Sequence, residues 1–388
     1  MDTTAEIKHT TLQDKYFGKL LHISFDKARR LIKKHGSPLL VLSRNRAKEA
    51  YLSLQRALPG VQIFYAMKSN SHPDILKTLK DLGTSFETAS YAELKMLVKI
   101  GVNPKDVLCT QPFLSEKDFK SCYEAGQRWF VVDSLSQLKR LAKINSDFDV
   151  LVRLSFPDPH CQVDLSHKFG ATVKDAKEIV REAAHLGVRT HGVSFHVGSQ
   201  SYSVKKYIKA LMVVRKFIDD FQHEGIMLDT IDIGGGFPVP YTKKTPSIEH
   251  FCLPIRRKLN ELFPGMKIST EPGRFISGLT MNLITTVNGK NMRHGVPWYY
   301  LDDGLYNSFS GKVYDKCSYE IITEKDGHKT KSVLAGPTCD SFDIISEDVE
   351  LPELEIGDIL LVPSMGAYTS ISATNYHGFE KAKIITID

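Results

Sequence analysis

The sequence predicts an α/β protein in which a (β/α)8 TIM-like barrel is followed by a C-terminal all-β domain of sandwich-like type. Between residues 38 and 280, short apolar runs alternate with helical stretches, and roughly eight or nine such units match the rhythm of a closed barrel. After residue 282 the helical stretches stop and strand-like runs follow one another. The chain of 388 residues, 42% hydrophobic and 25% charged, is long enough for two domains.

The elements are predicted in chain order from apolar periodicity and stop signals. Residues 1–37 form an N-terminal segment that we expect to pack with the β domain, and its amphipathic helix over 24–35 ends at Gly36-Ser37-Pro38. Residues 38–280 form the barrel, with helices such as 92–99 and 173–186 between its strands. The strands are expected at 39–42, 62–66, 85–87, 107–109, 129–133, 150–154, 192–196, 230–233 and 268–271. An open doubly wound sheet would show the same rhythm, and periodicity alone does not exclude it.

Residues 281–388 are predicted to form the β domain. Strand-like runs occur at 297–301, 332–335 and 359–362. Turn signals separate them, including Asp326-Gly327 and the segment 355–358, and no long helical pattern intervenes.

Composition and charge exclude several classes of function. Lysines and arginines exceed acidic residues by 6, but the charges are interspersed, so we expect no nucleic-acid partner. No run of about 18 apolar residues occurs and the N-terminus lacks the pattern of a signal peptide, so we expect no membrane association and a cytoplasmic location. The six cysteines show no zinc-ligand spacing, so no metal site is predicted and reduced thiols are expected.

Ionisable residues recur where the barrel strands are predicted to end. Lys68 follows the strand at 62–66, and Glu87, Arg153, His196 and Glu271 close four others. The carboxyl ends of the strands build the active site of such barrels, so the recurrence indicates a site. Each residue alone has a structural explanation, as a surface lysine, a core histidine or an ion pair. Together they favour Lys68 as an amine that bonds covalently to a carbonyl cofactor.

Two turns indicate that the cofactor is phosphorylated. Gly234-Gly235-Gly236 lets the backbone approach a phosphate closely, although glycine triplets also make turns without a ligand. The segment Glu271-Pro272-Gly273-Arg274 adds a carboxylate and a phosphate-pairing guanidinium around a rigid turn. No Walker loop and no dinucleotide-binding glycine motif occurs.

The set of motifs identifies a family. The chain resembles, essentially end to end, the fold-type III pyridoxal-phosphate decarboxylases of basic amino acids, and most closely the ornithine decarboxylase group. The motifs that carry the resemblance are Tyr65-Ala66-Met67-Lys68-Ser69-Asn70, Phe86-Glu87-Thr88-Ala89-Ser90, Lys168-Phe169-Gly170, Ser194-Phe195-His196-Val197-Gly198-Ser199, Gly234-Gly235-Gly236, Glu271-Pro272-Gly273-Arg274, Cys339-Asp340 and Gly366-Ala367-Tyr368-Thr369.

The resemblance implies pyridoxal 5'-phosphate as the cofactor and a role for each matching residue. Lys68 would hold the cofactor covalently, Glu271 would pair with the pyridine nitrogen and His196 would stack on the ring. Cys339 would protonate the α-carbon. The other cofactor-binding residues would be Glu87 and Arg153 in the pocket, and Ser199, Gly234, Gly235, Gly236, Gly273, Arg274 and Tyr368 near the phosphate. The resemblance also implies a homodimer with shared active sites, in which the partner supplies Cys339 and Asp340.

The implied activity is a carboxy-lyase that converts L-ornithine to putrescine and CO2 in polyamine biosynthesis, with L-lysine to cadaverine as a second reaction. Substrate contacts are expected from Tyr306, Tyr314, Asp315, Asp340 and Tyr376, because paired carboxylates suit a distal ammonium group. One methylene separates the two substrates and is worth only about 1–3 kcal/mol of discrimination.

Alternatives to ornithine decarboxylation stay open. They are a decarboxylase that prefers lysine or another basic or D-amino acid, and a non-catalytic regulatory homologue, against which the presence of Lys68, Cys339 and Asp340 argues. Diaminopimelate decarboxylation and racemisation rank lower. The segments 111–114 and 156–164 depart from the family pattern, which leaves substrate preference open.

Overall fold

The protein is described by a computed structural model that covers residues 19–157 and 165–388. The chain divides into two compact units. Arg44–Val239 and Thr245–Gly278 make up the barrel unit. The described residues up to Ser43, together with Pro240–Lys244 and Leu279–Asp388, make up the β unit.

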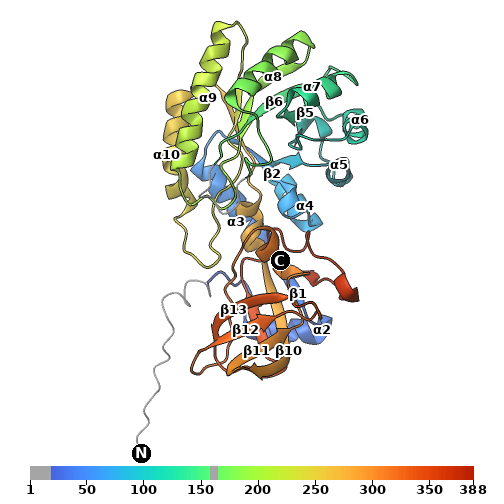
Figure 1. The fold of residues 1–388 in the computed structure, drawn as a ribbon, viewed down its shortest axis with the longest axis vertical. Helices are drawn as coiled ribbons and strands as arrows, with labels where there is room; N and C mark the ends of the chain where they lie inside the picture. The colour runs from blue at the N-terminus through green and yellow to red at the C-terminus, as the bar shows by residue number, and fades with distance from the viewer. Residues whose placement is uncertain (1–18, 158–164) are drawn as a thin grey trace, which may run out of the picture. The chain divides into compact units, whose positions relative to one another are not determined.

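Eight parallel strands close the barrel unit, in the order β2 to β9, which confirms the predicted fold class over the open sheet. The strands are β2 Gln62–Ala66, β3 Ser85–Thr88, β4 Val107–Cys109, β5 Trp129–Val132, β6 Asp149–Leu154, β7 Arg189–Phe195, β8 Thr230–Asp232 and β9 Lys267–Thr270. The helices, which surround the strands in Figure 1, are α3 Arg44–Ala57, α4 Pro73–Asp81, α5 Tyr91–Lys99, α6 Glu116–Glu124, α7 Leu135–Ala142, α8 Val173–His185, α9 Lys205–His223, α10 Ile248–Leu262 and the short α11 Arg274–Ser277.

Apolar side chains pack inside the barrel, and side-chain caps fix where the surrounding helices begin. Leu108, Val131 and Leu151 are buried together, with Phe64 and Trp129 packed against them, as expected for the filled interior of such a barrel. Most helices begin with a hydroxyl cap directly after a strand-to-helix loop, at Ser90, Ser115, Ser134, Thr172 and Ser247. These strand-to-helix loops at the carboxyl ends of the strands therefore end at defined residues.

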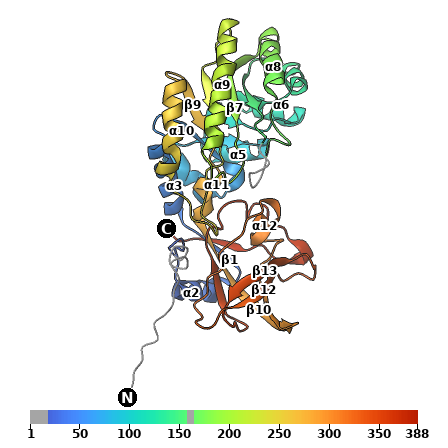
Figure 2. The ribbon, with the colours of Figure 1, turned by 60° about the vertical axis from the view of Figure 1, so that its left-hand side comes forward.

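A seven-stranded sheet forms the β unit, in the order β13-β12-β11-β10-β1-β15, with β14 paired to β10. The long strand β10 pairs with β1 and β14 through its first half and with β11 through its second half, across a register shift between Val287 and Gly289. Figure 2 shows β12 beside β13 in this unit. The strands are β1 Leu39–Leu42, β10 Met281–Arg293, β11 Val296–Leu301, β12 Thr330–Ala335, β13 Ile344–Leu351, β14 Ile359–Val362 and β15 Lys383–Thr386, with helices α2 Phe25–His35 and α12 Gly311–Tyr314.

Strand β1 corrects the predicted domain boundary. The segment 39–42 was expected to be the first barrel strand, but it pairs with β10 and β15 in the β unit. The barrel therefore begins at residue 44 instead of 38 and ends at 278 instead of 280. All four residues of β1 are buried and apolar, a pattern that suits a barrel strand and a central sheet strand equally. Helix α2 packs on this sheet through Ala28, near Leu39 and Ile284.

No helix among residues 19–157 and 165–388 is long and apolar enough to cross a membrane.

Candidate active site

Lys68 lies in a 3-10 turn, Met67–Ser69, directly after strand β2. Its Nζ donates to Glu87 Oε1 over 2.6 Å, and Thr110 Oγ1 donates to the same oxygen over 2.6 Å. The Glu87 side chain is fully buried, whereas 43% of the Lys68 side chain is exposed. The second oxygen of Glu87 is buried without a hydrogen-bond partner among the described residues. Because an unpaired buried acceptor is costly, this oxygen is suited to receive a bond from a ligand beside Lys68.

The turn that presents Lys68 is held from both sides. Tyr65 Oη donates to the carbonyl of Asn70 over 2.8 Å, and Ser69 Oγ donates to the carbonyl of Ala66 over 2.9 Å. Gly273 lies against it so closely that an added Cβ would be 3.0 Å from Ser69 Cβ and 3.1 Å from Ala66 Cβ. A side chain at position 273 would push this turn away, so Gly273 positions Lys68.

His196 follows directly after strand β7 and carries a neutral ring. The Gly198 amide donates to Nδ1 over 3.0 Å, so Nδ1 acts as an acceptor and the single proton of the neutral ring belongs on Nε2. Burial holds the pKa of His196 well below its usual value, and the positive charges of Arg153 and Lys68 act in the same direction. The Nε2 atom would lie 3.4 Å from a Cβ added at Gly235. A flat, uncharged ring therefore lies against the glycine triplet, close enough to Lys68 for that charge to lower its pKa.

The glycine triplet has no room for side chains. An added Cβ at Gly234, Gly235 or Gly236 would lie 2.2, 2.5 or 2.3 Å from a backbone oxygen of a neighbouring loop. Gly234 and Gly236 also have φ angles of 65° and 106°, which side chains disfavour. The carbonyl oxygens of the three glycines accept bonds from Thr270 Oγ1, Tyr207 Oη and the Ser201 amide at 2.6, 2.8 and 2.8 Å. The loop is therefore rigid, and its backbone can contact a ligand directly.

Beside this loop, Arg274 Nε donates to Ser199 Oγ over 3.1 Å. Arg274 is 5% exposed, and its helix α11 begins directly after Gly273. A buried guanidinium and a hydroxyl next to a tight glycine loop are the donor set that a phosphate group needs.

The buried Asp232 ends strand β8, and the half-buried Glu271 follows directly after strand β9. Burial raises the pKa of Glu271 well above its usual value, and the neighbouring Asp232 adds to the effect. Burial also raises the pKa of Asp232 to about 6, although Ser269 Oγ and the Gly234 amide donate to its carboxylate. Desolvated carboxyl groups that repel each other gain stability when a cation is placed between or beside them.

Arg153 partly balances these acids. Its guanidinium lies 5.1 Å from the centre of the Phe169 ring. Burial lowers its pKa, while Glu271 and Asp133, the two carboxyl groups with the largest effect, raise it. Asp133 itself accepts from the Gly170 amide over 2.8 Å, and burial raises its pKa. Arg153 is thus a half-buried guanidinium among several carboxyl groups, in addition to the buried guanidinium of Arg274.

The remaining predicted residues belong to the β unit, where five side chains form a connected group that we call the Cys339 cluster. Tyr306 donates from its hydroxyl to Asp340, and its ring stacks on that of Tyr376 at 4.2 Å. Tyr376 stacks in turn on His377 at 3.9 Å, and His377 Nδ1 lies 3.6 Å from Cys339 Sγ. The hydrogen bonds from the Phe342 amide and from Tyr306 lower the pKa of Asp340, so this carboxylate is ionised at neutral pH.

Three further predicted residues of the β unit stand outside this group. Tyr314 ends helix α12 and is 65% exposed. Asp315 caps the same helix, its amide bonded to the carbonyl of Gly311 over 3.0 Å. Tyr368 is half-buried with a φ of 55°, and its carbonyl accepts from Ser372 Oγ over 2.9 Å.

Sequence reasoning missed four residues of these groups. Asp232 lies inside a run that was read as apolar, where a lone carboxylate is itself an unusual signal. Thr110 and Asp133 follow strands β4 and β5, and their position at strand ends is a signal of the same kind that selected Glu87. His377 follows Tyr376 in a loop and carries no signal in the sequence. Its role depends on a contact between segments that are 38 residues apart.

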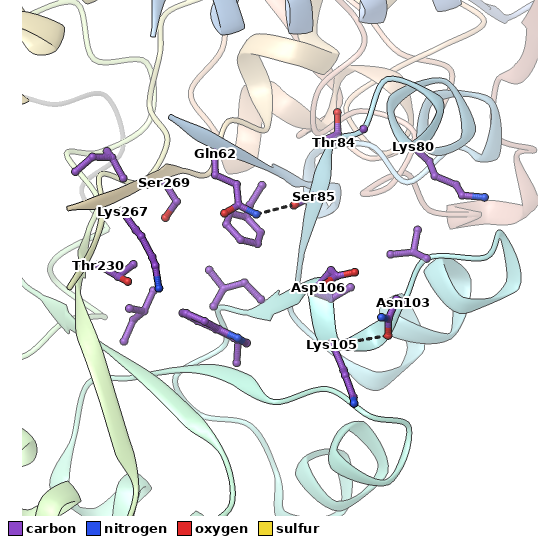
Figure 3. Close-up of a pocket in the computed structure, with 18 of the residues that line it drawn as sticks. Gln62, Lys80, Thr84, Ser85, Asn103, Lys105, Asp106, Thr230, Lys267 and Ser269 are labelled. Atoms are coloured by element: carbon purple, nitrogen blue, oxygen red, sulfur yellow. Dashed lines mark hydrogen bonds between the residues drawn. The ribbon is translucent and has the colours of Figure 1, made fainter. Parts of the chain in front are cut away.

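A large cavity lies at the opposite end of the barrel (Figure 3). Its volume is about 510 Å3, and it is lined by residues at the amino ends of the strands, among them Gln62, Ser85, Trp129 and Lys267. None of the predicted site residues lines it. Lys267 is paired with Asp229 at 3.1 Å, and Gln62 Nε2 donates to Ser85 Oγ over 3.0 Å. The lining of this cavity therefore includes none of the lysine, histidine, arginine and carboxyl groups described above at the carboxyl ends of the strands.

The groups at the carboxyl end fit pyridoxal phosphate. The fit rests on the partly exposed side chain of Lys68, on the oxygen of Glu87 that has no partner among the described residues and on the glycine loop that excludes every Cβ. It also rests on the desolvated carboxyl group of Glu271, which would gain from a protonated ring nitrogen. When bound, this cofactor supplies an electron sink for the bond that breaks at the α-carbon.

Comparison with known proteins agrees with this fit. The chain matches the family "Pyridoxal-dependent decarboxylase, pyridoxal binding domain" over residues 44–278. It is 38% identical to a lysine/ornithine decarboxylase of Selenomonas ruminantium, over 95% of this chain and 94% of that protein. It is 32% identical to antizyme inhibitor 2 of Xenopus laevis, over 86% of this chain and 77% of that protein.

A solved structure is also similar. The lysine/ornithine decarboxylase of Vibrio vulnificus complexed with cadaverine aligns with a TM-score of 0.89 and 37% identity, over 94% of this chain and 100% of that one. The chain therefore belongs to the pyridoxal-dependent decarboxylases, and pyridoxal 5'-phosphate is its cofactor.

Proposed function

We propose that this protein decarboxylates L-ornithine to putrescine and CO2, and L-lysine to cadaverine. The observation that carries the proposal is the ionised carboxylate of Asp340 beside the thiol of Cys339. A carboxylate there attracts a substrate whose far end is an ammonium group and repels one that ends in a second carboxylate. The relatives named lysine/ornithine decarboxylase, one of them crystallised with cadaverine, support the same pair of substrates.

In this proposal the barrel unit binds and orients the cofactor. Lys68 bonds to it covalently, His196 covers the ring face and Glu271 pairs with the ring nitrogen. Ser199, Arg274 and the glycine loop bind the phosphate, joined by Tyr368, and Arg153 and Glu87 line the pocket. The neutral state of His196 suits a ring that stacks without placing a positive charge against a protonated pyridine.

The β unit provides the substrate end of the proposed site. Asp340 binds the distal ammonium, with Tyr306, Tyr376, Tyr314 and Asp315 around it. Cys339 delivers the proton that replaces CO2 on the α-carbon. Removing the carboxylate of Asp340 should weaken substrate binding far more than cofactor binding.

We further propose that two copies of the chain share their active sites. Large apolar side chains are exposed near the Cys339 cluster in sequence, and contact with a second copy would bury them; they are Val313, Tyr314, Phe342, Ile371, Tyr376 and Phe379. Small hollows lined by Tyr306, Tyr314 and Phe342, and by Tyr306, Tyr376 and Phe379, lie between them. An exposed apolar surface beside an exposed thiol favours a partner that completes the site.

Mixing two inactive variants tests the shared site. Lys68→Ala and Cys339→Ala should each have little activity alone. If each site takes its lysine and its thiol from different chains, random pairing restores one intact site in half of the dimers, about a quarter of wild-type activity. Activity no greater than the mean of the two separate variants would show that each chain builds its own site.

CO2 release from separate L-ornithine, L-lysine, L-arginine and meso-diaminopimelate, with the amine products identified, tests the reaction itself. Release from ornithine or lysine supports the proposal. The similarity to a protein named antizyme inhibitor 2 makes a regulatory homologue the second candidate. Failure to bind the cofactor would favour that candidate, whereas binding without release from all four would favour another basic or D-amino acid.

The free thiols at 109, 122, 252, 317 and 339 also favour a reducing, cytoplasmic location, which cell fractionation would test.

A further inference from the structure

His377 presents its ring to the thiol of Cys339. The Nδ1 atom lies 3.6 Å from Sγ, within hydrogen-bonding range of a sulfur atom, and both residues are exposed. The other free cysteines among the described residues, at 109, 122, 252 and 317, are buried. Cys339 is therefore the exposed free thiol of the described chain, and it faces a histidine.

The position of this ring is determined by its surroundings. His377 has a φ of 53°, a left-handed conformation that residues other than glycine adopt only where their surroundings hold them in it. Its ring stacks on Tyr376 with 23° between the planes, and Tyr376 stacks on Tyr306. Tyr306 bonds to Asp340, the neighbour of Cys339 in the chain. This series of contacts therefore starts at Cys339 and returns to its chain neighbour Asp340, and it holds His377 Nδ1 against Cys339 Sγ.

We propose that His377 returns the proton that Cys339 gives up in each turnover. This inference rests on the proposed decarboxylation, in which Cys339 is the acid. Replacing a carboxylate by hydrogen consumes one proton per molecule of substrate, and that proton must come from solvent. His377, with one nitrogen at the thiol and an exposed side chain, connects the two.

The proton transfers balance as follows. The S–H bond of Cys339 breaks as its proton forms the new C–H bond at the α-carbon, which leaves a thiolate. The protonated Nδ1 of His377 then gives its proton to Sγ, and the neutral ring takes a proton from water. The groups that face this pair are the carboxylate of Asp340 and the neutral hydroxyls of Tyr306 and Tyr376. His377 is thus a positioning residue that acts through Cys339.

His377→Asn is the variant that tests this role, because asparagine tolerates a positive φ and does not exchange protons. The chain offers a matched control in His294, another exposed histidine of the β unit with a φ of 52°. His294→Asn changes the same residue type in the same backbone conformation, away from Cys339.

Two readouts are measured on the holoenzyme. The first is the rate at which iodoacetamide alkylates Cys339, with the modified peptide identified by mass spectrometry. A ring nitrogen at the thiol can accept its proton as the sulfur reacts, so His377→Asn should slow alkylation roughly three- to tenfold and His294→Asn should not. The second is the number of turnovers before the cofactor is lost by protonation at its own carbon, which His377→Asn should reduce by a similar factor.

The two readouts separate the possible failures. Unchanged alkylation in His377→Asn would show that the pair does not form in solution and would overturn the inference. Slower alkylation with an unchanged number of turnovers would show that the pair forms but returns no proton, which also overturns it. If no substrate is decarboxylated, the proposed function fails and the proton-return role fails with it, while alkylation still reports whether the histidine activates the thiol.

Discussion

Gly236→Ala should disrupt cofactor binding more than it disrupts the fold. The new Cβ would lie 2.3 Å from the carbonyl oxygen of Gly198, whereas ordinary contact begins near 3.4 Å, so one of the two loops must move by about 1.1 Å. Both loops border the proposed phosphate site. A displacement of about 1 Å in such a site should lower the affinity for the cofactor on the order of 100-fold. The φ of 106° adds a cost to folding of about 1–2 kcal/mol.

Gly225→Ala is the control for the backbone cost. Gly225 has a φ of 78° and nothing within 4 Å of an added Cβ, so this variant is destabilised without any contact near the site. Urea unfolding would measure both stabilities, and titration with pyridoxal phosphate, followed by absorbance, would measure both affinities. We expect similar losses of stability but an affinity loss on the order of 100-fold only in Gly236→Ala. Equal affinities in the two variants would refute the role of the close approach.

Four other predictions concern single side chains. Lys68→Ala should lose turnover and the absorbance band of the covalently bound cofactor, and retained turnover would sink the assignment. Cys339→Ala should slow amine formation and divert protonation to the cofactor, as measured by the ratio of amine to inactivated enzyme, and an unchanged ratio would contradict its acid role. Asp340→Ala should raise KM for ornithine with little change in cofactor affinity, and equal losses of both would argue against a substrate contact. The folded-state pKa of Asp232 is raised to about 6 from 3.8, so the stability that Asp232 contributes to the apoprotein is present below pH about 4 and is lost as the pH rises to about 6. The loss is on the order of 2–3 kcal/mol in the free energy of unfolding. Asp232→Asn should flatten that part of the pH–stability curve, and an unchanged curve would show that another group causes the loss.

Local sequence patterns predicted most strand ends because each barrel strand is a short apolar run bounded by a turn or a helix cap. Ser90, for example, caps α5 two residues after β3 ends, so the position of Glu87 follows from its neighbours. The pattern failed at Leu39–Leu42, since four buried apolar residues fit two different sheets. Pairing with β10, more than 200 residues away, decides between them, and pairing over that separation leaves no local signal.

Local patterns in the sequence predicted alternating β/α units, a β domain after them and the residue types of the cofactor site, because strand ends and glycine turns have local signatures. They did not distinguish a closed barrel from an open sheet, since closure depends on the pairing of β2 with β9. Which of these side chains lie close together in the folded chain depends on the tertiary structure. Asp232 became a buried partner of Glu271, and Glu87 was left with an unpaired oxygen. The loop that places His377 beside Cys339 carries no motif of its own. Desolvation and hydrogen bonding depend on distances between segments remote in the chain, and those distances exist only after folding.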